Sequence, residues 1–188
     1  SDVCSSDLAV VYKESGAVSI SELWRECAVR VGREAGLAPS FLDVDYACYR
    51  LLRHPKEFDV IVTSNLFGDI LSDLGGILLG SRALTYGGNY GVDGSAFYQT
   101  NHGAAYDLAG GGRCNPLGQI FSIALLLWQS FGLHAESRII HEAVGRVLKA
   151  GWRTDDMRLP GTRVVGTRRM TELICEEIRT PGGNPALS

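Results

Sequence analysis

Short apolar runs alternate with amphipathic helical stretches along the first third of the chain, and this alternation limits the chain to few folds. Strand-like runs occupy residues 8–12, 41–44 and 59–63, and the last of them is rich in the β-branched residues found in buried parallel strands. Between these runs, apolar residues recur every three or four positions over residues 20–35 and 46–53, the pattern of helices with one buried face. This order of strands and helices predicts an α/β architecture.

The last third of the chain is predicted to be mostly helical. Residues 119–131 are apolar nearly all round, as in a buried helix, whereas residues 134–149 and 170–178 each carry one apolar face. Ser19 and Thr167 stand just before the first and the last helical pattern, and their hydroxyl groups suit helix caps. With the strands before them, these helices complete the α/β architecture.

The composition excludes several classes of protein. The chain has 18 Lys and Arg residues against 21 Asp and Glu residues, a net charge of −3, so it has no basic field for nucleic acid. Its longest apolar run, residues 123–128, is far shorter than the roughly 20 residues that cross a bilayer. Its five cysteines are scattered and form no CxxC pair, which argues against disulfides or structural zinc and predicts a cytoplasmic location.

The middle of the chain is rich in glycine, because residues 68–118 hold 13 of the 23 glycines. Glycine at this density marks tight turns and places where the backbone approaches another group closely. A flexible linker is the alternative interpretation. The segment also contains aromatic residues that make it too apolar for such a linker, namely Tyr86, Tyr90, Phe97, Tyr98 and Tyr106.

Asp69 and Asp73 follow the strand-like run at residues 59–63 and a polar turn. They are four residues apart in a helix predicted over residues 69–79, so both carboxylates project from one helical face. The two charges repel each other unless a cation lies between them, and oxygen ligands of this kind suit Mg²⁺ or Mn²⁺. A solvated helix face is the alternative, although the apolar residues around the pair leave little polar surface.

Residues at the ends of the first two strands have both a functional and a structural interpretation. Lys13 ends the first strand and is either a solvated lysine or a proton-transfer group whose pKa is lowered by burial beside a metal. Asp45 is either a functional carboxylate or the N-cap of the helix over residues 46–53. For Asp43, a surface position on the strand is an equal alternative.

Residues 102–115 have the composition of a loop that binds an anion. Small residues after His102 allow backbone N–H groups to reach a pyrophosphate. The Asp107 carboxylate can accept two hydrogen bonds from a ribose diol and repels a 2′-phosphate, which favours NAD over NADP. No GxGxxG motif follows a strand, so an ordinary Rossmann site is not predicted, and an ordinary surface loop is the alternative.

Taken together, these segments resemble the isocitrate/isopropylmalate dehydrogenase family of decarboxylating β-hydroxyacid dehydrogenases. The resemblance rests on residues 58–73, on residues 102–105 with Asn115 and Pro116, and on residues 151–154. It extends over most of the chain and corresponds to the C-terminal half of a typical family member.

The resemblance implies an α/β, isopropylmalate dehydrogenase-like two-domain fold, present here as an incomplete C-terminal fragment. Residues 9–80 would form the C-terminal part of the metal-binding and dimerisation domain, and residues 81–188 that of the NAD-binding domain. Residues 1–8 are interpreted as a non-native leader. We expect the family's upstream half, with its catalytic tyrosine and substrate-binding arginines, to be missing.

The resemblance also assigns roles to single residues. Lys13 matches the proton-transfer lysine of the family and shares its catalytic role with Asp45. The implied ligands of Mg²⁺ or Mn²⁺ are Asp69 and Asp73 of one protomer with Asp45 of its partner in a homodimer. The implied NAD contacts are His102, Gly103, Ala104, Ala105, Asp107, Leu108 and Asn115.

The implied reaction is oxidation of a malate-type 2-hydroxy acid, such as 3-isopropylmalate, by hydride transfer to NAD, followed by loss of CO₂. The implied partners are a small hydroxy-dicarboxylate or tricarboxylate and a second copy of the chain, with neither nucleic acid nor membrane. We expect the fragment alone to be inactive. A non-catalytic regulatory subunit or pseudoenzyme of the same family is the alternative, and the presence of Lys13 and the three aspartates weighs against it.

Overall fold

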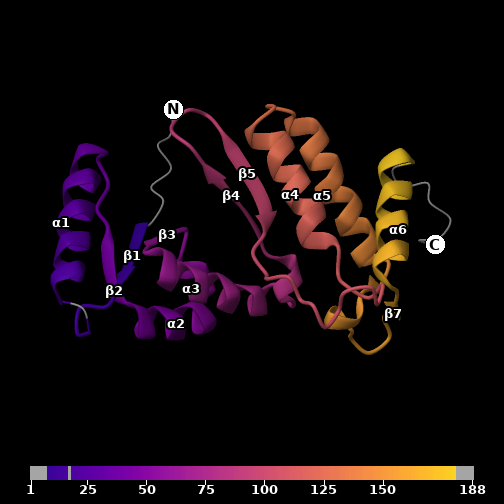
Figure 1. Ribbon diagram of the computed structural model, residues 1–188, viewed down its shortest axis with the longest axis horizontal. Helices are drawn as coiled ribbons and strands as arrows, with labels where there is room; N and C mark the ends of the chain where they lie inside the picture. The colour runs from indigo at the N-terminus through magenta and orange to yellow at the C-terminus, as the bar shows by residue number, and fades with distance from the viewer. Residues whose placement is uncertain (1–7, 17, 181–188) are drawn as a thin grey trace. The chain divides into compact units, whose positions relative to one another are not determined.

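The computed structural model of the protein describes residues 8–16 and 18–180 (Figure 1). The chain separates into two compact units, one up to Leu78 and one from Leu79. Each unit has its own core, so each is described by itself.

The first unit alternates strands and helices. Its elements, in chain order, are β1 (Leu8–Tyr12), α1 (Val18–Glu34), β2 (Ser40–Asp43), α2 (Val44–Arg53), the 3₁₀ turn η1 (Pro55–Glu57), β3 (Val60–Thr63) and α3 (Asn65–Leu78). The strands form a parallel sheet in the order β2-β1-β3. The predicted α/β architecture is therefore confirmed.

Strand β1 is the centre of this unit, since it is paired on both sides and its last four residues are buried. Successive side chains of a strand point to opposite faces of the sheet. Val11 accordingly packs against Ala47 of α2 and Leu71 of α3, whereas Val10 lines a hollow together with Trp24 of α1. Helix α1 thus covers one face of the sheet, and α2 and α3 cover the other.

The order β2-β1-β3 fixes where a site can lie. The chain leaves β1 through α1 to β2 on one side and then returns through α2 to β3 on the other side. The connections therefore diverge at β1, and in open α/β sheets ligands bind outside the carboxyl ends of the strands at such a point. Residues that follow β1, β2 and β3 share this edge.

The second unit is a mixture of short strands and long helices. Its elements are the 3₁₀ turn η2 (Arg82–Leu84), β4 (Tyr86–Tyr90), β5 (Ala96–Thr100), α4 (Leu117–Gln129), α5 (His134–Lys149), β6 (Trp152–Arg153), the 3₁₀ turn η3 (Asp155–Met157), β7 (Arg163–Val164) and α6 (Thr167–Arg179). Strands β4 and β5 form an antiparallel hairpin, and β6 pairs in parallel with β7.

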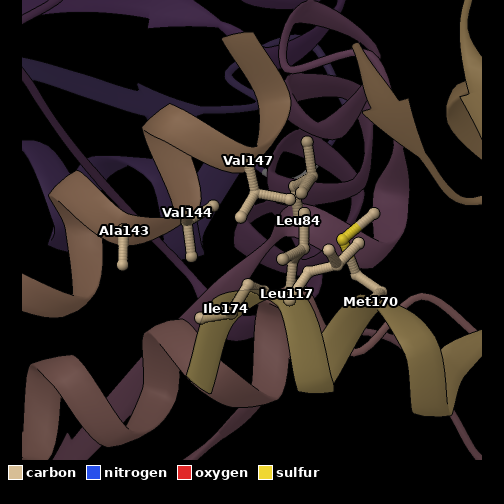
Figure 2. Packing of buried hydrophobic residues seen from close by; sticks show 8 residues of the cluster. Leu84, Leu117, Ala143, Val144, Val147, Met170 and Ile174 are labelled. Carbon is tan, nitrogen blue, oxygen red and sulfur yellow. The ribbon is translucent and has the colours of Figure 1, made fainter. Parts of the chain in front are cut away.

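Helices α4, α5 and α6 and the turn η2 enclose the core of the second unit. Figure 2 shows the side chains of α5 and α6 meeting those of η2 and α4. The buried cluster comprises Leu84, Leu117, Ala143, Val144, Val147, Met170, Leu173 and Ile174. Among the described residues of the chain, no helix combines the length and the apolar composition that a membrane crossing requires.

The ends of several helices differ from the predicted ones. Ser19 lies inside α1 and is not its cap, because the helix already includes Val18. Helix α2 begins at Val44, so Asp43 occupies the N-cap position and the structural alternative for Asp45 is wrong. Thr167 is also not a cap, because it is the first residue of α6 and its hydroxyl donates to the Cys114 carbonyl in the loop before α4.

Helix α4 differs from its prediction in a second way. It begins two residues early, at Leu117, because the Asn115 Oδ1 accepts the Leu117 N–H at 3.0 Å. Ile123 and Trp128 are 46% and 42% exposed, so the helix is not buried all round.

Gly118→Ala is expected to destabilise the chain by about 2 kcal/mol, because it overpacks a buried site. A Cβ at this position would lie 2.7 Å from the Ala83 carbonyl oxygen and 3.1 Å from that of Thr85, and neither backbone atom can rotate away. Gly145→Ala is the matched control: it lies on the exposed side of α5 with no atom within 4 Å of the new methyl group. This control should stabilise the helix by about 0.5–1 kcal/mol. Urea unfolding of the full chain gives both values, and a Gly118→Ala variant as stable as the native chain would contradict the packing argument.

Candidate functional site

Lys13 lies at the edge of the sheet where the chain connections diverge. Its Nζ donates hydrogen bonds to Asp45 Oδ1 at 2.6 Å and to Asp43 Oδ2 at 3.1 Å. These three side chains meet because Tyr12, the last residue of β1, pairs with Asp43, the last residue of β2. The backbone of Lys13 is also fixed, since its carbonyl accepts the Ser21 hydroxyl at 2.8 Å. The structure therefore brings the two predicted catalytic residues, Lys13 and Asp45, into direct contact.

This contact controls the charges of the three groups. Hydrogen bonds to Asp45 and then to Asp43 raise the pKa of Lys13 above its ordinary value. In this arrangement the two carboxylates outweigh burial. The predicted lowering of the Lys13 pKa concerns a site with a bound metal and stays a prediction. The hydrogen bond from Lys13 lowers the pKa of Asp45, and hydrogen bonds from the Glu14 N–H and from Lys13 lower that of Asp43. At neutral pH the cluster is one cation between two anions.

Sequence reasoning did not separate Asp43 from an ordinary surface residue. Its carboxylate accepts hydrogen bonds from Lys13 Nζ, from the Glu14 N–H at 3.0 Å and from the Ser15 hydroxyl at 3.4 Å. The available signal was its place at the carboxyl end of β2, because β2 lies beside β1 and Lys13 follows β1. That signal requires the sheet order, which the sequence alone does not give.

Asp69 and Asp73 both belong to α3, one helical turn apart. Asp69 is exposed and Asp73 is partly buried, and the Ser72 hydroxyl donates to the Asp69 carbonyl at 3.0 Å. Two carboxylates on one face are a suitable donor set for a hard divalent cation that keeps water or substrate ligands. Within the part of the chain that the structure describes, no three acidic, histidine or cysteine side chains form a group able to hold a metal. Asp45 therefore does not join Asp69 and Asp73 within one chain, and its arrival from a second copy stays a prediction.

The second unit contains a hollow of about 450 Å³ beside residues 102–115. This volume falls in the range of small-molecule sites. Of the seven predicted NAD contacts, all but Ala104 line it. The full lining consists of Ser81, Arg82, Ala83, His102, Gly103, Ala105, Asp107, Leu108, Arg113, Cys114, Asn115 and Asp156.

Glycine shapes the loop at this hollow. Gly110 and Gly112 have positive φ values of 75° and 63°, which side chains with a Cβ rarely adopt. The Gly112 carbonyl accepts the Thr167 N–H at 2.8 Å, and a Cβ on Gly166 would come within 2.5 Å of that oxygen. The glycines therefore serve turns and a close approach to the start of α6, as predicted, and the linker alternative does not apply.

One non-glycine residue of the loop also has a left-handed backbone. Ala105 has a φ of 45°, and its carbonyl accepts the Leu108 N–H at 2.9 Å. This conformation costs about 1 kcal/mol or more for a residue with a Cβ. The turn that follows Ala105 places Asp107 and Leu108 at the hollow.

Asn115 connects the wall of the hollow to helix α4. Besides accepting the Leu117 N–H, its amide donates to Asp156 Oδ2 at 2.9 Å. Asp156 also accepts the Ser81 hydroxyl. Burial raises the pKa of Asp156, but the hydrogen bonds from Ser81 and Asn115 outweigh burial, so the pKa lies below its ordinary value. The side chain of Asn115 is thus held by its neighbours within the wall.

The hollow includes three charged residues that sequence reasoning missed, namely Arg82, Arg113 and Asp156. Arg113 lay within the predicted loop and could have been found there by its charge. Arg82 and Asp156 come from segments 20 residues before and 41 residues after the loop's ends. Only the fold brings them together.

The chain matches known proteins over most of its length. The model of the family described as isocitrate/isopropylmalate dehydrogenase matches residues 3–174. The chain is 41% identical over 167 residues to a 3-isopropylmalate dehydrogenase of Halalkalibacterium halodurans. This match covers 88% of this chain and 46% of that protein. A second 3-isopropylmalate dehydrogenase, of Nitratidesulfovibrio vulgaris, is 42% identical over 177 residues, 94% of this chain and 48% of its own length. The chain therefore spans about half the length of the curated relatives it matches.

Solved structures agree with the sequence comparisons. A crystal structure of isocitrate dehydrogenase from Methylococcus capsulatus superposes with a TM-score of 0.85 at 33% identity, covering 93% of this chain and 51% of that one. A β-decarboxylating dehydrogenase from Thermococcus kodakarensis gives a TM-score of 0.77 at 36% identity, covering 92% of this chain and 49% of that one.

Asn115→Asp is expected to destabilise the chain by roughly 2 kcal/mol at neutral pH, because it places a second carboxylate against Asp156 in place of an amide donor. Two carboxylates in contact share a proton with a raised pKa in the folded state only. Acidification therefore protonates the folded variant more readily than the unfolded one. As a result, Asn115→Asp should destabilise the chain less at about pH 4 than at about pH 6. Urea unfolding at both pH values measures the change.

Asn115→Ala is the control for this experiment. It removes the hydrogen bond donated to Asp156, and also the one accepted from the Leu117 N–H, without adding a charge, so its loss of stability should change less over the same pH range. An Asn115→Asp variant whose loss does not shrink at the lower pH would disprove the proximity of the two carboxyl groups.

Proposed function

The chain belongs to the isocitrate/isopropylmalate dehydrogenase family, and on this premise we propose that the protein oxidises and decarboxylates a malate-type 2-hydroxy acid with NAD and Mg²⁺ or Mn²⁺. The favoured substrate class is a hydroxy-dicarboxylate such as 3-isopropylmalate. The name carried by the relatives cited above supports this choice.

The contact between Lys13 and Asp45 carries the proposal. The two residues lie 32 positions apart, and the family resemblance implies a catalytic role for each of them. Their side chains meet at 2.6 Å at the carboxyl end of the central strand, where an α/β sheet holds its ligands. With its raised pKa, Lys13 holds a proton at Nζ at neutral pH. In the proposed reaction, the ionised Asp45 beside Lys13 would take up the proton that the substrate hydroxyl loses on oxidation, and Lys13 would deliver its own proton to the carbon that loses CO₂.

The metal is assigned to carboxylates of two protomers. Asp69 and Asp73 of one copy would hold it together with Asp45 of the other copy. Bound there, a divalent cation polarises the substrate oxygen on which charge develops. The role of the chain is to keep these carboxylates ionised and in place, and Lys13 contributes because its hydrogen bond lowers the pKa of Asp45.

The hollow at residues 102–115 is assigned to NAD. Bound NAD accepts the hydride of the substrate. The exposed carboxylate of Asp107 would accept hydrogen bonds from the ribose diol, and the backbone of Gly103 to Ala105 would face the pyrophosphate. His102 and Asn115 would contact the adenine. The lining of the hollow and its size support this assignment.

A homodimer is proposed from the surface of the first unit. Helices α2 and α3 pack against each other, yet both expose large apolar side chains on the single chain. These exposed residues are Tyr46, Tyr49, Leu52, Leu66, Ile70 and Ile77. Apolar patches of this kind mark protein interfaces. Asp45 is adjacent in sequence to this patch on α2, and Asp69 adjoins it on α3, so an interface here would bring Asp45 of one copy near Asp69 of the other.

Turnover of the full-length protein that contains this chain tests the proposed reaction. With 3-isopropylmalate, isocitrate or tartrate as substrate and with NAD and Mg²⁺, NADH formation is expected for one of these acids, and the 188-residue chain alone should give none. Lys13→Ala should lower the rate by about a hundredfold or more, as expected for loss of a proton-transfer group. The control Lys56→Ala removes an exposed lysine of η1 and should leave the rate unchanged. A full-length protein without turnover on any of the three acids would favour the non-catalytic alternative.

Ile70→Lys tests the dimer and the metal site together. Ile70 is 50% exposed on α3, and a lysine there would be buried without a partner in the proposed interface. The dimer dissociation constant should rise by about a hundredfold, and Mn²⁺ affinity should fall with it because the third carboxylate is lost. Light scattering and Mn²⁺ titration measure the two effects. The control is Ile139→Lys, a 40% exposed position on α5 of the second unit, and a dimer unaffected by Ile70→Lys would contradict the proposed interface.

A further inference from the structure

The hollow of the second unit is lined by two charged side chains, one acidic and one basic, that bind no described residue of the protein. Asp156 and His102 are engaged, because Asp156 accepts from Ser81 and Asn115 and a ring nitrogen of His102 lies 2.9 Å from the Gly103 carbonyl oxygen. By contrast, the side chains of Asp107 and Arg113 form no hydrogen bond or ion pair with any residue in the described ranges 8–16 and 18–180. Both line the hollow, so both are available to a ligand.

Asp107 and Arg113 are carried by one compact segment of backbone. The Gly111 N–H donates to the carbonyl of Leu108, the neighbour of Asp107, at 3.1 Å. The Arg113 side chain lies over this turn, since its Nε is 3.7 Å from the position of a Cβ on Gly111. The Thr167 N–H of α6 donates a hydrogen bond to the Gly112 carbonyl of the same segment. The two charges are therefore presented at one wall by a fixed turn.

An acidic and a basic side chain at the same wall can bind more than one kind of nucleotide. A carboxylate accepts hydrogen bonds from a free ribose diol and repels a phosphate at the same position. A guanidinium donates paired hydrogen bonds to phosphate and does not lose its charge. With Asp107 alone the hollow would exclude a 2′-phosphate, whereas Arg113 offsets that repulsion.

We propose that Arg113 is a second determinant of cofactor choice, which lets the hollow accept a nucleotide with a 2′-phosphate as well as one with a free 2′-hydroxyl. The proposal rests on the proposed function, because it takes the hollow to be the nucleotide site. It adds that the preference between NAD and NADP is a balance between Asp107 and Arg113.

Binding of two small probes to the full chain tests the proposal without turnover. 5′-AMP carries the free diol, and 2′,5′-ADP differs from it by the 2′-phosphate alone. By calorimetry at one fixed salt concentration, the native chain should bind both. Arg113→Gln should weaken binding of 2′,5′-ADP about tenfold or more and change that of 5′-AMP about threefold at most, as expected for loss of a charged hydrogen bond to the added phosphate. Asp107→Asn should change the ratio of the two dissociation constants in the opposite direction.

Arg158→Gln is the matched control. Arg158 is exposed, pairs with Asp155 at 2.7 Å and does not line the hollow, so its loss removes the same charge from the same unit. This variant should leave the ratio unchanged, and a shift as large as that of Arg113→Gln would overturn the proposal by showing a general charge effect.

The remaining outcomes distinguish a failure of the role of Arg113 from a failure of the nucleotide site. If 5′-AMP binds and 2′,5′-ADP does not, or if Arg113→Gln weakens both probes equally, Arg113 has no role in the choice and the proposal is wrong while the nucleotide site stands. If neither probe binds to the native chain, the assignment of the hollow to a nucleotide fails, and the proposal fails with it. Circular dichroism of each variant establishes that a lost affinity does not reflect a lost fold.

Discussion

The parallel pairing of β1 with β2 is the constraint on which the candidate catalytic centre depends. It places Tyr12 opposite Asp43, and so brings the residue that follows each strand to the same edge of the sheet. Because a one-residue change of register would turn every side chain to the other face, the buried Val10 and Val11 fix this register by their packing. The position of the Lys13 ammonium between two carboxylates is thus a consequence of core packing a few residues away.

A different constraint shapes the second unit, where a loop without regular structure must hold a fixed wall. Its stability comes from contacts with the first residues of α4 and α6. The Thr167 N–H and hydroxyl bind the carbonyls of Gly112 and Cys114, and the Asn115 side chain starts α4. The approach of this loop to α6 is possible because Gly166 has no Cβ at the point of contact, and the turn itself is possible because Gly112 adopts a φ of 63°. Asp107 can then face the hollow without also holding the loop together, whereas Asn115 does both.

The sequence predicted what depends on local pattern and missed what depends on the order of elements. The strand over Leu8–Tyr12 and the helix over His134–Lys149 have the predicted bounds, because their apolar spacing is strong. Helix starts were less predictable. Asn115 acts through the nearby Leu117 N–H, a local signal that the apolar spacing does not contain, whereas Thr167 acts through the Cys114 carbonyl, which only the fold brings near. Asp43 was missed for the same reason, because its role appears only when β2 lies beside β1. The family resemblance, in turn, located Lys13 and Asp45 but not the hydrogen bond between them.

The charges of the proposed centre also determine which groups must hold its substrate. Asp43, Asp45, Asp69 and Asp73 bring four negative charges and Lys13 brings one positive charge. A divalent cation neutralises most of this excess but leaves the centre negative, and a hydroxy-dicarboxylate adds two further negative charges. Proteins hold anions of this kind with arginine or lysine side chains. In the first unit, the described ion pairs of Asp43 and Asp45 involve Lys13 and no arginine. The proposed activity therefore requires cationic groups in addition to Lys13 to hold the substrate carboxylates.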